Sequence, residues 1–247
     1  MIQDLHSHTY YSFCGKDRPE DIVEAAIAGG VELFGICDHN SGVGYGRRQL
    51  YKLPGEDPLA DYEGTVRRYF DHINLIREKY ADRIRILRGI EIYTGTERFR
   101  AALPDGVDIS FFDYCLLEAI DQPEQSIAKG DLFAYAERCG CPVGVAHTDL
   151  FAFIQSIGED PYRYFKRMAE QGIFWEMNVS YDSIHHYREH PYMLSFFEDA
   201  EQQAIVRESG VRLSVGFDGH RVEDYRPDRV RDACRRIGEM GIRLAFE

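Results

Sequence analysis

The sequence predicts an α/β fold in which seven parallel strands form a closed or nearly closed barrel. Short apolar runs alternate with longer amphipathic stretches, and polar residues follow most of the runs. This alternation is typical of βα units with right-handed crossovers. A doubly wound open sheet is the alternative, because the pattern alone does not decide closure. The expected strands are Ile2–Leu5, Leu33–Cys37, Ile84–Ile92, Tyr114–Ile120, Pro142–Ala146, Ile173–Val179 and Val211–Phe217.

Helical patterns occupy most of the segments between these runs. One helix begins at Pro19, where acidic residues in the first turn favour the positive end of the helix dipole. Gly29 and Gly30 end it, as expected for a left-handed C-cap. Apolar residues at helical spacing predict a second helix around Val66–Ile76. Further helices are expected at Gln125–Cys139, Asp160–Gln171, Pro191–Ser209 and Pro227–Met240.

Composition restricts the class of protein. The chain has 247 residues, 44% hydrophobic and 29% charged, and a formal net charge of −13. One domain over 1–247 accommodates this length. The negative charge disfavours nucleic acid and anionic membrane surfaces as partners. No apolar run reaches the ~18 residues of a membrane span, and the N-terminus lacks an export signal. We therefore expect a cytoplasmic protein.

The six cysteines agree with a reducing compartment. Cys37, Cys115 and Cys141 fall in or beside apolar strands, where reduced cysteine packs as a small core residue. Cys139 and Cys141 are too closely spaced for a usual zinc site, so packing is the preferred interpretation.

Histidines and carboxylates follow the predicted strands. In a barrel the C-terminal ends of the strands meet at one face, where active sites are built. A set of seven unpaired polar residues at this face would be costly to bury, which favours metal binding. The residues are His6, His8, His39, Glu91, His147, Asp218 and His220.

This pattern suits a centre of more than one divalent ion. His6 and His8 point to the same side of a strand because side chains alternate with period two, and both can reach one ion. A carboxylate such as Glu91 can bridge two ions. Two ions about 3.5–4 Å apart can hold the attacking and leaving oxygens of a phosphoryl displacement and activate water as hydroxide.

The same motifs resemble those of the polymerase and histidinol phosphatase (PHP) family, and the likeness extends over nearly the whole chain. The matching segments are His6–Thr9, Cys37–His39, Gly89–Glu91, Ala146–Thr148 and Phe217–His220. Glu176–Ser180 and Gly216–Asp224 look most like the stand-alone histidinol-phosphate phosphatase branch.

The resemblance implies a distorted seven-stranded (β/α)7 barrel with up to three zinc, manganese or iron ions. It implies that His6, His8, Glu91 and Asp218 hold the first ion. Glu91 and His147 would share the second, and His39 and His220 would hold the third.

Two positions depart from the family pattern. The histidine expected eight residues after His6 is Cys14, and a thiolate is a good zinc ligand. The histidine expected after the fourth strand is missing. A strict count places Ile120 there, with Glu118 or Asp121 as substitutes. We therefore expect two to three divalent ions.

Arginines are the expected phosphate ligands, since a guanidinium binds phosphate through two parallel hydrogen bonds. Arg221 follows the last metal ligand directly, and Arg47, Arg48 and Arg188 lie in loops on the same predicted face. The glycine-rich segment 41–46 lacks a Walker lysine and is interpreted as a mobile substrate loop. A pocket for the organic leaving group could be lined by Tyr45, Tyr51, Tyr181 and Tyr187. A proton donor to the leaving alcohol could be one of His185, His186 and His190.

The leading hypothesis is a hydrolase that cleaves a small phosphate monoester with a metal-activated hydroxide. Histidinol phosphate is the first substrate to test. Glu91 and Asp218 would act as catalytic ligands, and Asp38 or Asp218 would orient the nucleophile. The alternatives are a phosphodiesterase, a metal-dependent amidohydrolase and a non-catalytic metal-binding domain. The amidohydrolase is less favoured, because no predicted strand ends in a lysine that could be carbamylated to bridge two ions.

Overall fold

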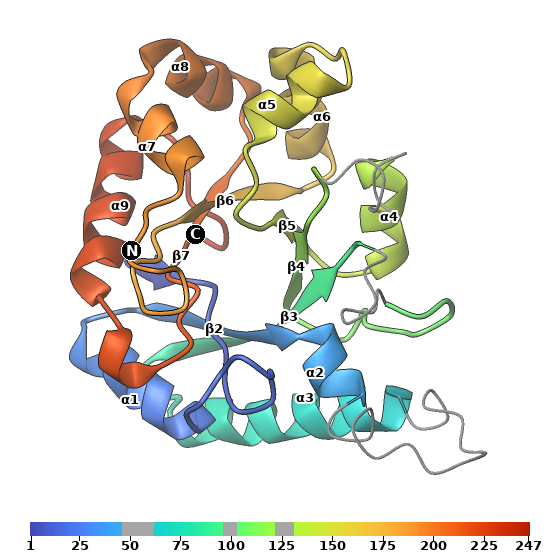
Figure 1. Ribbon diagram of the computed structural model, residues 1–247, viewed down its shortest axis with the longest axis vertical. Helices are drawn as coiled ribbons and strands as arrows, with labels where there is room; N and C mark the ends of the chain where they lie inside the picture. Colours follow the sequence, from blue (N-terminus) through green and yellow to red (C-terminus); the bar gives the residue numbers. More distant parts are fainter. Residues whose placement is uncertain (46–61, 96–102, 122–130) are drawn as a thin grey trace.

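The computed structural model describes residues 1–45, 62–95, 103–121 and 131–247. Seven parallel strands lie side by side in the order of the chain, and helices surround them (Figure 1). The strands are β1 (Gln3–Asp4), β2 (Leu33–His39), β3 (Arg85–Tyr93), β4 (Tyr114–Glu118), β5 (Val143–Val145), β6 (Phe174–Asn178) and β7 (Leu213–Gly216). All seven expected strands are therefore confirmed, with ends shifted by a few residues.

The first and last strands meet and bring the sheet close to a full barrel. The backbone of Leu5 donates to Val215 O at 2.8 Å, and His8 donates to Gly219 O at 2.8 Å. Ser7 and Gly219 form an isolated parallel bridge beyond the ends of β1 and β7. Pairing is uneven, because β2 and β3 share seven residue pairs whereas β5 and β6 share two. A distorted, nearly closed seven-stranded barrel is thus confirmed, and the open sheet is excluded.

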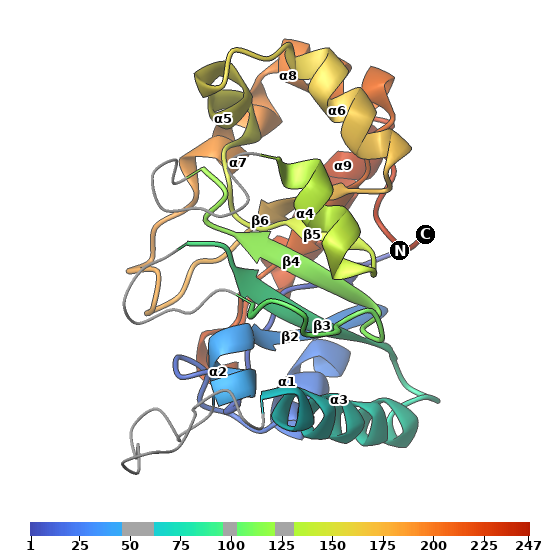
Figure 2. The same cartoon turned by 90° about the vertical axis from the view of Figure 1, so that its right-hand side faces the viewer.

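Helices pack around the outside of the barrel, with α1 and α3 on one side and α5 to α8 on the other (Figure 2). They are α1 (Pro19–Ala28), α2 (Asn40–Tyr45), α3 (Tyr62–Lys79), α4 (Leu132–Cys139), α5 (Leu150–Ser156), α6 (Pro161–Glu170), α7 (Pro191–Glu198), α8 (Ala200–Ser209) and α9 (Pro227–Glu239), with a short 3-10 helix η2 (Val222–Asp224). Among the described residues, no helix has the length and apolar character needed to cross a membrane.

Two expectations about helices were wrong. The single helix expected at Pro191–Ser209 is interrupted at Asp199, whose extended backbone ends α7 and whose carboxylate caps α8 by accepting from Glu201 and Gln202. The described part of the glycine-rich segment is a helix, α2, rather than a loop. A Cβ on Gly44 would come within 2.0 Å of the Tyr62 ring, so glycine allows α2 to pack closely against α3.

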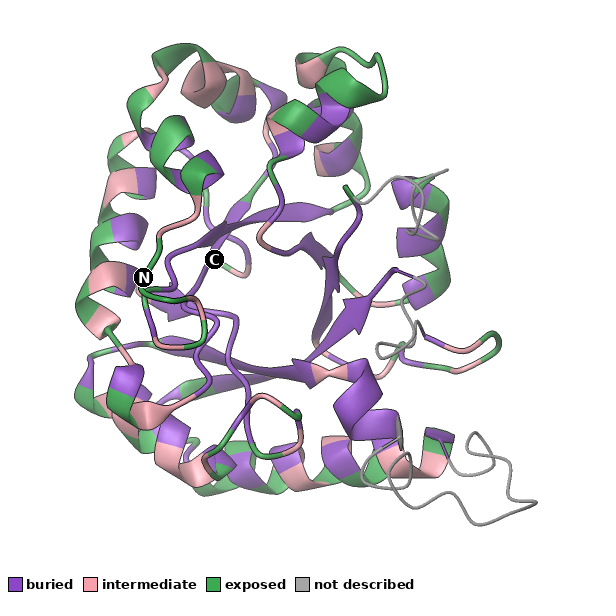
Figure 3. Ribbon diagram, viewed as in Figure 1, coloured by how far each residue is buried: buried purple, intermediate pink, exposed green. Residues whose placement is uncertain are grey.

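Apolar side chains fill both the inside of the barrel and the layer beneath the helices. The strands are almost entirely buried, whereas the outer helix faces are exposed (Figure 3). Inside the barrel, the Tyr114 ring lies over Gly35 and Gly89, where a Cβ would leave it no room, and its hydroxyl donates to Leu5 O at 2.5 Å.

Polar residues take over the inward-facing positions toward the C-terminal ends of the strands. Leu87 in β3 and Leu116 in β4 belong to the inner core. The next inward residues toward the strand ends include Glu91 and Glu118, because side chains alternate along a strand. The apolar barrel interior thus forms the floor of a polar site.

Candidate metal centre

Four side chains from three strand ends lie close together. His6 and His8 follow β1, Glu91 lies in β3, and Asp218 follows β7. The Nε2 atoms of His6 and His8 are 3.1 Å apart. Asp218 Oδ1 lies 2.9 Å from His8 Nε2, and Glu91 Oε1 lies 3.2 Å from His6 Nε2. All four side chains are almost fully buried.

These separations fit a bound divalent ion. Four ligands at 2.0–2.1 Å in tetrahedral geometry are about 3.3–3.4 Å from each other. His6 Nε2, His8 Nε2 and Asp218 Oδ1 lie 2.9–3.6 Å from one another. Glu91 contacts the same two histidines, with Oε1 3.2 Å from His6 Nε2 and Oε2 3.5 Å from His8 Nε2. Imidazole nitrogens and carboxylate oxygens are also the ligand types of zinc, manganese and iron. The structure therefore brings together the four residues expected at the first ion.

A second group lies on the other side of Glu91. His39 Nδ1 is 2.7 Å from Glu91 Oε2 and 3.2 Å from Glu118 Oε1. His147 Nε2 is 3.2 Å from Glu91 Oε1. Glu91 therefore contacts both groups through its two oxygens, as a bridging carboxylate would.

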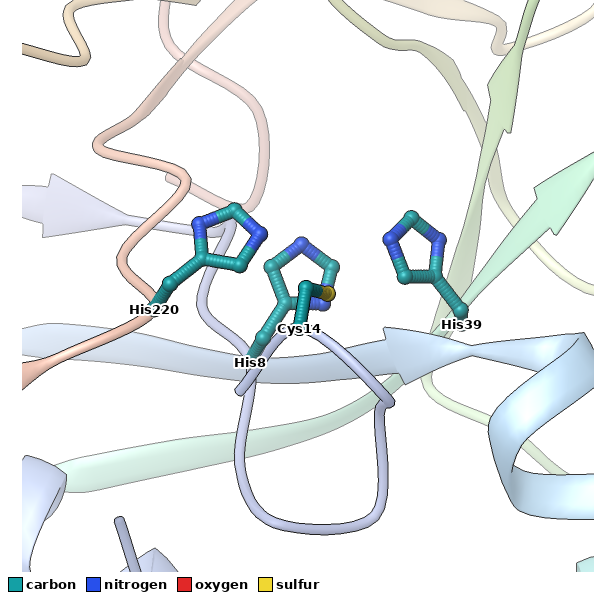
Figure 4. Close-up of side chains that lie close together, drawn as sticks. All are labelled: His8, Cys14, His39 and His220. Carbon is teal, nitrogen blue, oxygen red and sulfur yellow. The ribbon is translucent and has the colours of Figure 1, made fainter. Parts of the chain in front are cut away.

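Cys14, His8, His39 and His220 form a third group. One ligand atom from each lies within 4.8 Å of the others. The His8 ring lies between those of His39 and His220, with centroids 4.5 Å away in both cases, and the Cys14 sulfur approaches the same space (Figure 4). The structure thus places Cys14 where the sequence predicted a replacement ligand.

Glu176 holds the ligands in place from behind. Its Oε1 lies 2.7 Å from His6 Nδ1, and its Oε2 accepts from the His147 backbone at 2.8 Å. A carboxylate on the far nitrogen of a ligating histidine fixes the ring and makes it a better ligand. Gly216 allows this approach, because a Cβ there would lie 2.0 Å from Glu176 Oε1.

The loop between β6 and α7 reaches the cluster through His185. Its Nε2 is 3.0 Å from Asp218 Oδ2, and its Nδ1 is 2.7 Å from Asp182 Oδ1. Asp182 Oδ2 lies 3.8 Å from His220 Nδ1. The His185 side chain keeps 20% of its surface exposed, so it lies at the solvent side of the site.

The buried charges compensate one another. Burial disfavours charged histidine, but Glu91, Glu176 and Asp218 outweigh it and raise the pKa of His6. Burial likewise disfavours ionised Glu91, yet His39 and His6 hold the pKa of that carboxyl well below its usual range. Hydrogen bonds from His220 and His39 overcome burial and lower the pKa of Cys14 to about 7.

Two of the ligand positions have a strained backbone. Asp218 has φ 56° and His147 has φ 23°, the left-handed region that costs energy for residues other than glycine. Such conformations concentrate at functional sites, where the surrounding structure enforces them.

Residues 4–239 match the PHP domain. The chain belongs to the PHP-domain family. A histidinol-phosphatase of Lactococcus lactis is 27% identical over 130 residues, which are 53% of this chain and 43% of that protein. The aligned stretch therefore spans less than half of that relative.

One solved structure has the same fold. The crystal structure of the L. lactis histidinol phosphate phosphatase complexed with zinc, L-histidinol and phosphate matches 98% of this chain and 95% of its own, with 16% identity and a TM-score of 0.54. The putative histidinol phosphatase of Listeria monocytogenes matches 98% and 93%, with 16% identity and a TM-score of 0.42.

Asp38, which was expected from the sequence to orient the nucleophile, is instead hydrogen-bonded to the loop after β1. Its two oxygens accept four hydrogen bonds, from the backbone and hydroxyl groups of Thr9 and Ser12, at 2.6–3.0 Å. The carboxylate thus holds the loop that carries Cys14. This geometry favours a positioning role for Asp38 over the expected catalytic one.

After the fourth strand, where the family has a histidine and counting along the sequence points to Ile120, the structure places a different residue at the centre. Glu118, not Ile120, reaches the centre; Ile120 is fully buried in the outer core and Asp121 is exposed. Ala119 between them has φ 63°, which breaks the alternation of side chains beyond the end of β4.

The predicted phosphate-binding arginines are not gathered at the described centre. Arg221 lies beside α1 and η2, with Nη1 3.6 Å from Glu223 Oε1. Arg188 is exposed in the same loop as His185. Arg47 and Arg48 lie outside the described residues.

Sequence reasoning missed Glu176 and Asp182 as functional residues and assigned His185 no definite role. The inward direction of Glu176 was predictable, since it follows the inner-core residue Phe174 by two positions in β6 and side chains alternate along a strand. His185 and Asp182 lie in a loop, where no periodicity indicates which way a side chain points.

Proposed function

We propose that this chain is a metal-dependent phosphoester hydrolase that acts on a small phosphate monoester, and that histidinol phosphate is the first substrate to test. The observation that carries the proposal is the grouping of His6, His8 and Asp218 at separations that fit a divalent ion, with Glu91 in contact with both histidines. The two adjoining groups around Glu118 and Cys14 extend this centre to two or three ions. The named relative and the PHP fold support the choice of phosphoester chemistry.

Each part of the proposed site has a distinct task. His6, His8, Glu91 and Asp218 would hold one ion, and His39, Glu118, His147, Cys14 and His220 would hold the others. Bound divalent ions lower the pKa of water and polarise a phosphoryl oxygen. Glu176 keeps His6 oriented, and Asp38 holds the loop of Cys14.

The substrate would approach from the solvent side, where the loop between β6 and α7 lies. His185 has a ring nitrogen at the edge of the cluster and is our candidate to hydrogen-bond the phosphoester. Arg188 follows three residues later and is the described arginine nearest to it in the chain. Arg47 and Arg48 remain predictions for the phosphate.

The metallohydrolase domain is proposed to comprise residues 1–247 and to work in the reducing cytoplasm. All six cysteines are free, and Cys14 requires its thiol to act as a ligand. Zinc, manganese and iron are the proposed metals.

A metal-loaded ester screen tests the proposal. Apoprotein is reconstituted with zinc, manganese or iron and assayed for release of inorganic phosphate from histidinol phosphate, other monoesters and a phosphodiester. We expect metal-dependent release from at least one monoester. No release under any metal would contradict the proposal, and preference for the diester would favour the phosphodiesterase alternative.

Glu91→Gln is the decisive variant, because it removes the charge of the bridging carboxylate. Loss of an outer-shell partner alone costs about 10–100-fold in metal affinity or activity. We therefore expect Glu91→Gln to lose more than this in both turnover and metal content. Glu198→Gln, on the exposed face of α7, is the matched control and should leave both unchanged. Normal turnover in Glu91→Gln would exclude Glu91 as the bridge.

A further inference from the structure

The two departures from the family pattern, Cys14 and Glu118, belong to two groups that share His39. Cys14 and His220 are in one group with His39, and Glu91 and Glu118 are in the other. His39 belongs to both groups, since its Nδ1 faces the two glutamates and one of its ring nitrogens lies within 4.8 Å of the Cys14 sulfur. The centre therefore contains two donor sets that share a boundary but differ in composition.

The donor set around Cys14 is soft. It consists of one sulfur and the imidazoles of His39 and His220, with the His8 ring stacked between them. No carboxylate belongs to the group of four side chains that contains Cys14 among the described residues. Thiolate and imidazole ligands favour zinc and disfavour manganese and magnesium.

The donor set around Glu118 is hard. Glu118 Oε1 and Glu91 Oε2 both face His39 Nδ1, at 3.2 and 2.7 Å. Both carboxylates are buried, so their charge is poorly screened by solvent. Manganese binds carboxylate oxygen more readily than it binds sulfur. A position rich in carboxylates therefore disfavours manganese less than the Cys14 position does.

We infer that the centre is divided into a soft position at Cys14 that selects zinc and a hard position at Glu118 that accepts manganese. The inference rests on the proposed metal centre and assigns its ions, but it does not depend on turnover. Zinc binds most sites more tightly than manganese, so the division is one of relative preference. At the soft position, the sulfur of Cys14 replaces the histidine nitrogen of the family pattern. At the hard position, a carboxylate oxygen of Glu118 takes the place of the missing histidine.

Cobalt substitution reports on the soft position directly. A thiolate bound to Co(II) gives an intense near-ultraviolet charge-transfer absorption, which imidazole and carboxylate ligands do not give. Apoprotein loaded with Co(II) should show this absorption, and zinc should displace it. Cys14→Ser should abolish it, whereas Cys141→Ser, which changes a half-buried cysteine outside the centre, should retain it. Absence of the absorption in the wild type, or its persistence in Cys14→Ser, would overturn the assignment.

Competition between zinc and manganese tests the division. Cys14→Ser should weaken zinc binding at the soft position at least about tenfold, since even the loss of an outer-shell partner costs this much. The manganese affinity, followed by electron paramagnetic resonance, should fall by a smaller factor than the zinc affinity, because Cys14 reaches the Glu118 group only through the shared His39. Glu118→Gln should do the reverse, keeping the cobalt absorption and losing manganese affinity at least about tenfold.

Glu118→His and Cys14→His complete the test. Glu118→His should raise the preference for zinc over manganese at its position, and Cys14→His should keep a bound zinc without the cobalt absorption. Equal effects of the Cys14 and Glu118 variants on both metals would overturn the division. Because every readout is metal binding, a protein that passes these tests but cleaves no phosphate ester would refute the proposed function and retain this inference.

Discussion

Single residues behind the candidate ligands orient their side chains. Glu176 contacts His6 through one oxygen and the His147 backbone through the other. In Glu176→Gln, one of these positions becomes an amide NH₂ group and can no longer accept. We expect metal affinity to fall about 10–100-fold, the usual cost of losing an outer-shell partner. Titration of the apoprotein with zinc measures the loss.

Glu170→Gln provides the matched control for Glu176. Glu170 is exposed on α6 and its contact with Lys166 is 3.9 Å, so its loss should cost nothing measurable. Zinc affinity in Glu176→Gln equal to that of the control would show that His6 needs no support from Glu176.

The ligands were predictable from the sequence where they lie on regular strands. Glu91 follows the inner-core residue Leu87 at an even spacing, so periodicity alone points it into the barrel. The count failed at Glu118 and Ile120 because Ala119 takes a positive φ, which no pattern of apolar residues reveals. The environment of Asp38 also lay beyond sequence reasoning, since its partners Thr9 and Ser12 come from a loop.

At the scale of elements, four of the described helices begin after an aspartate. Asp131, Asp149, Asp160 and Asp199 each accept hydrogen bonds from backbone amides of the helix that follows. Asp199 divides the segment that the apolar pattern treats as one helix. The N-cap signal was present in the sequence there, but apolar periodicity continued across it.

The loop between β6 and α7 is fastened to α9 by Arg229. The guanidinium donates to Val179 O at 2.9 Å, ion-pairs with Glu189 and lies over the Tyr181 ring. In Arg229→Ala these contacts are lost, and the loop that carries His185 should be less ordered. We expect faster hydrogen exchange in residues 181–190 and a rise in KM of about tenfold, equivalent to about 1.4 kcal/mol.

Arg235→Ala separates this effect from general damage to α9. Arg235 ion-pairs with Asp232 and Glu239 on the same exposed helix face, where such pairs contribute little. Metal content should be unchanged in both variants, since neither arginine touches a ligand. Unaltered exchange in residues 181–190 of Arg229→Ala would mean that the loop is held by other contacts.

For the whole molecule, barrel closure joins metal binding to folding. His6 and His8 follow the first strand, Glu91 lies in the third and Asp218 follows the last, so an ion held by these residues connects the beginning of the chain to its end. The backbone contacts that close the barrel are few, chiefly those of Leu5, His8 and Asp218 with the opposite segment. Unfolding separates the ligands, and a bound ion therefore stabilises only the folded barrel.

Removal of metal should lower the melting temperature. An ion present at about 100 times its Kd stabilises the native state by about 2.7 kcal/mol. For a domain of this size, each kcal/mol shifts Tm by about 2–4 °C, so chelation should lower Tm by about 5–10 °C. Scanning calorimetry before and after dialysis against a chelator measures the shift, and added zinc should reverse it. Glu91→Gln should show a smaller chelator shift than the wild type, because it has already lost the ions that Glu91 holds. If chelation lowers Tm as much in Glu91→Gln as in the wild type, the stabilising ion is not held by Glu91.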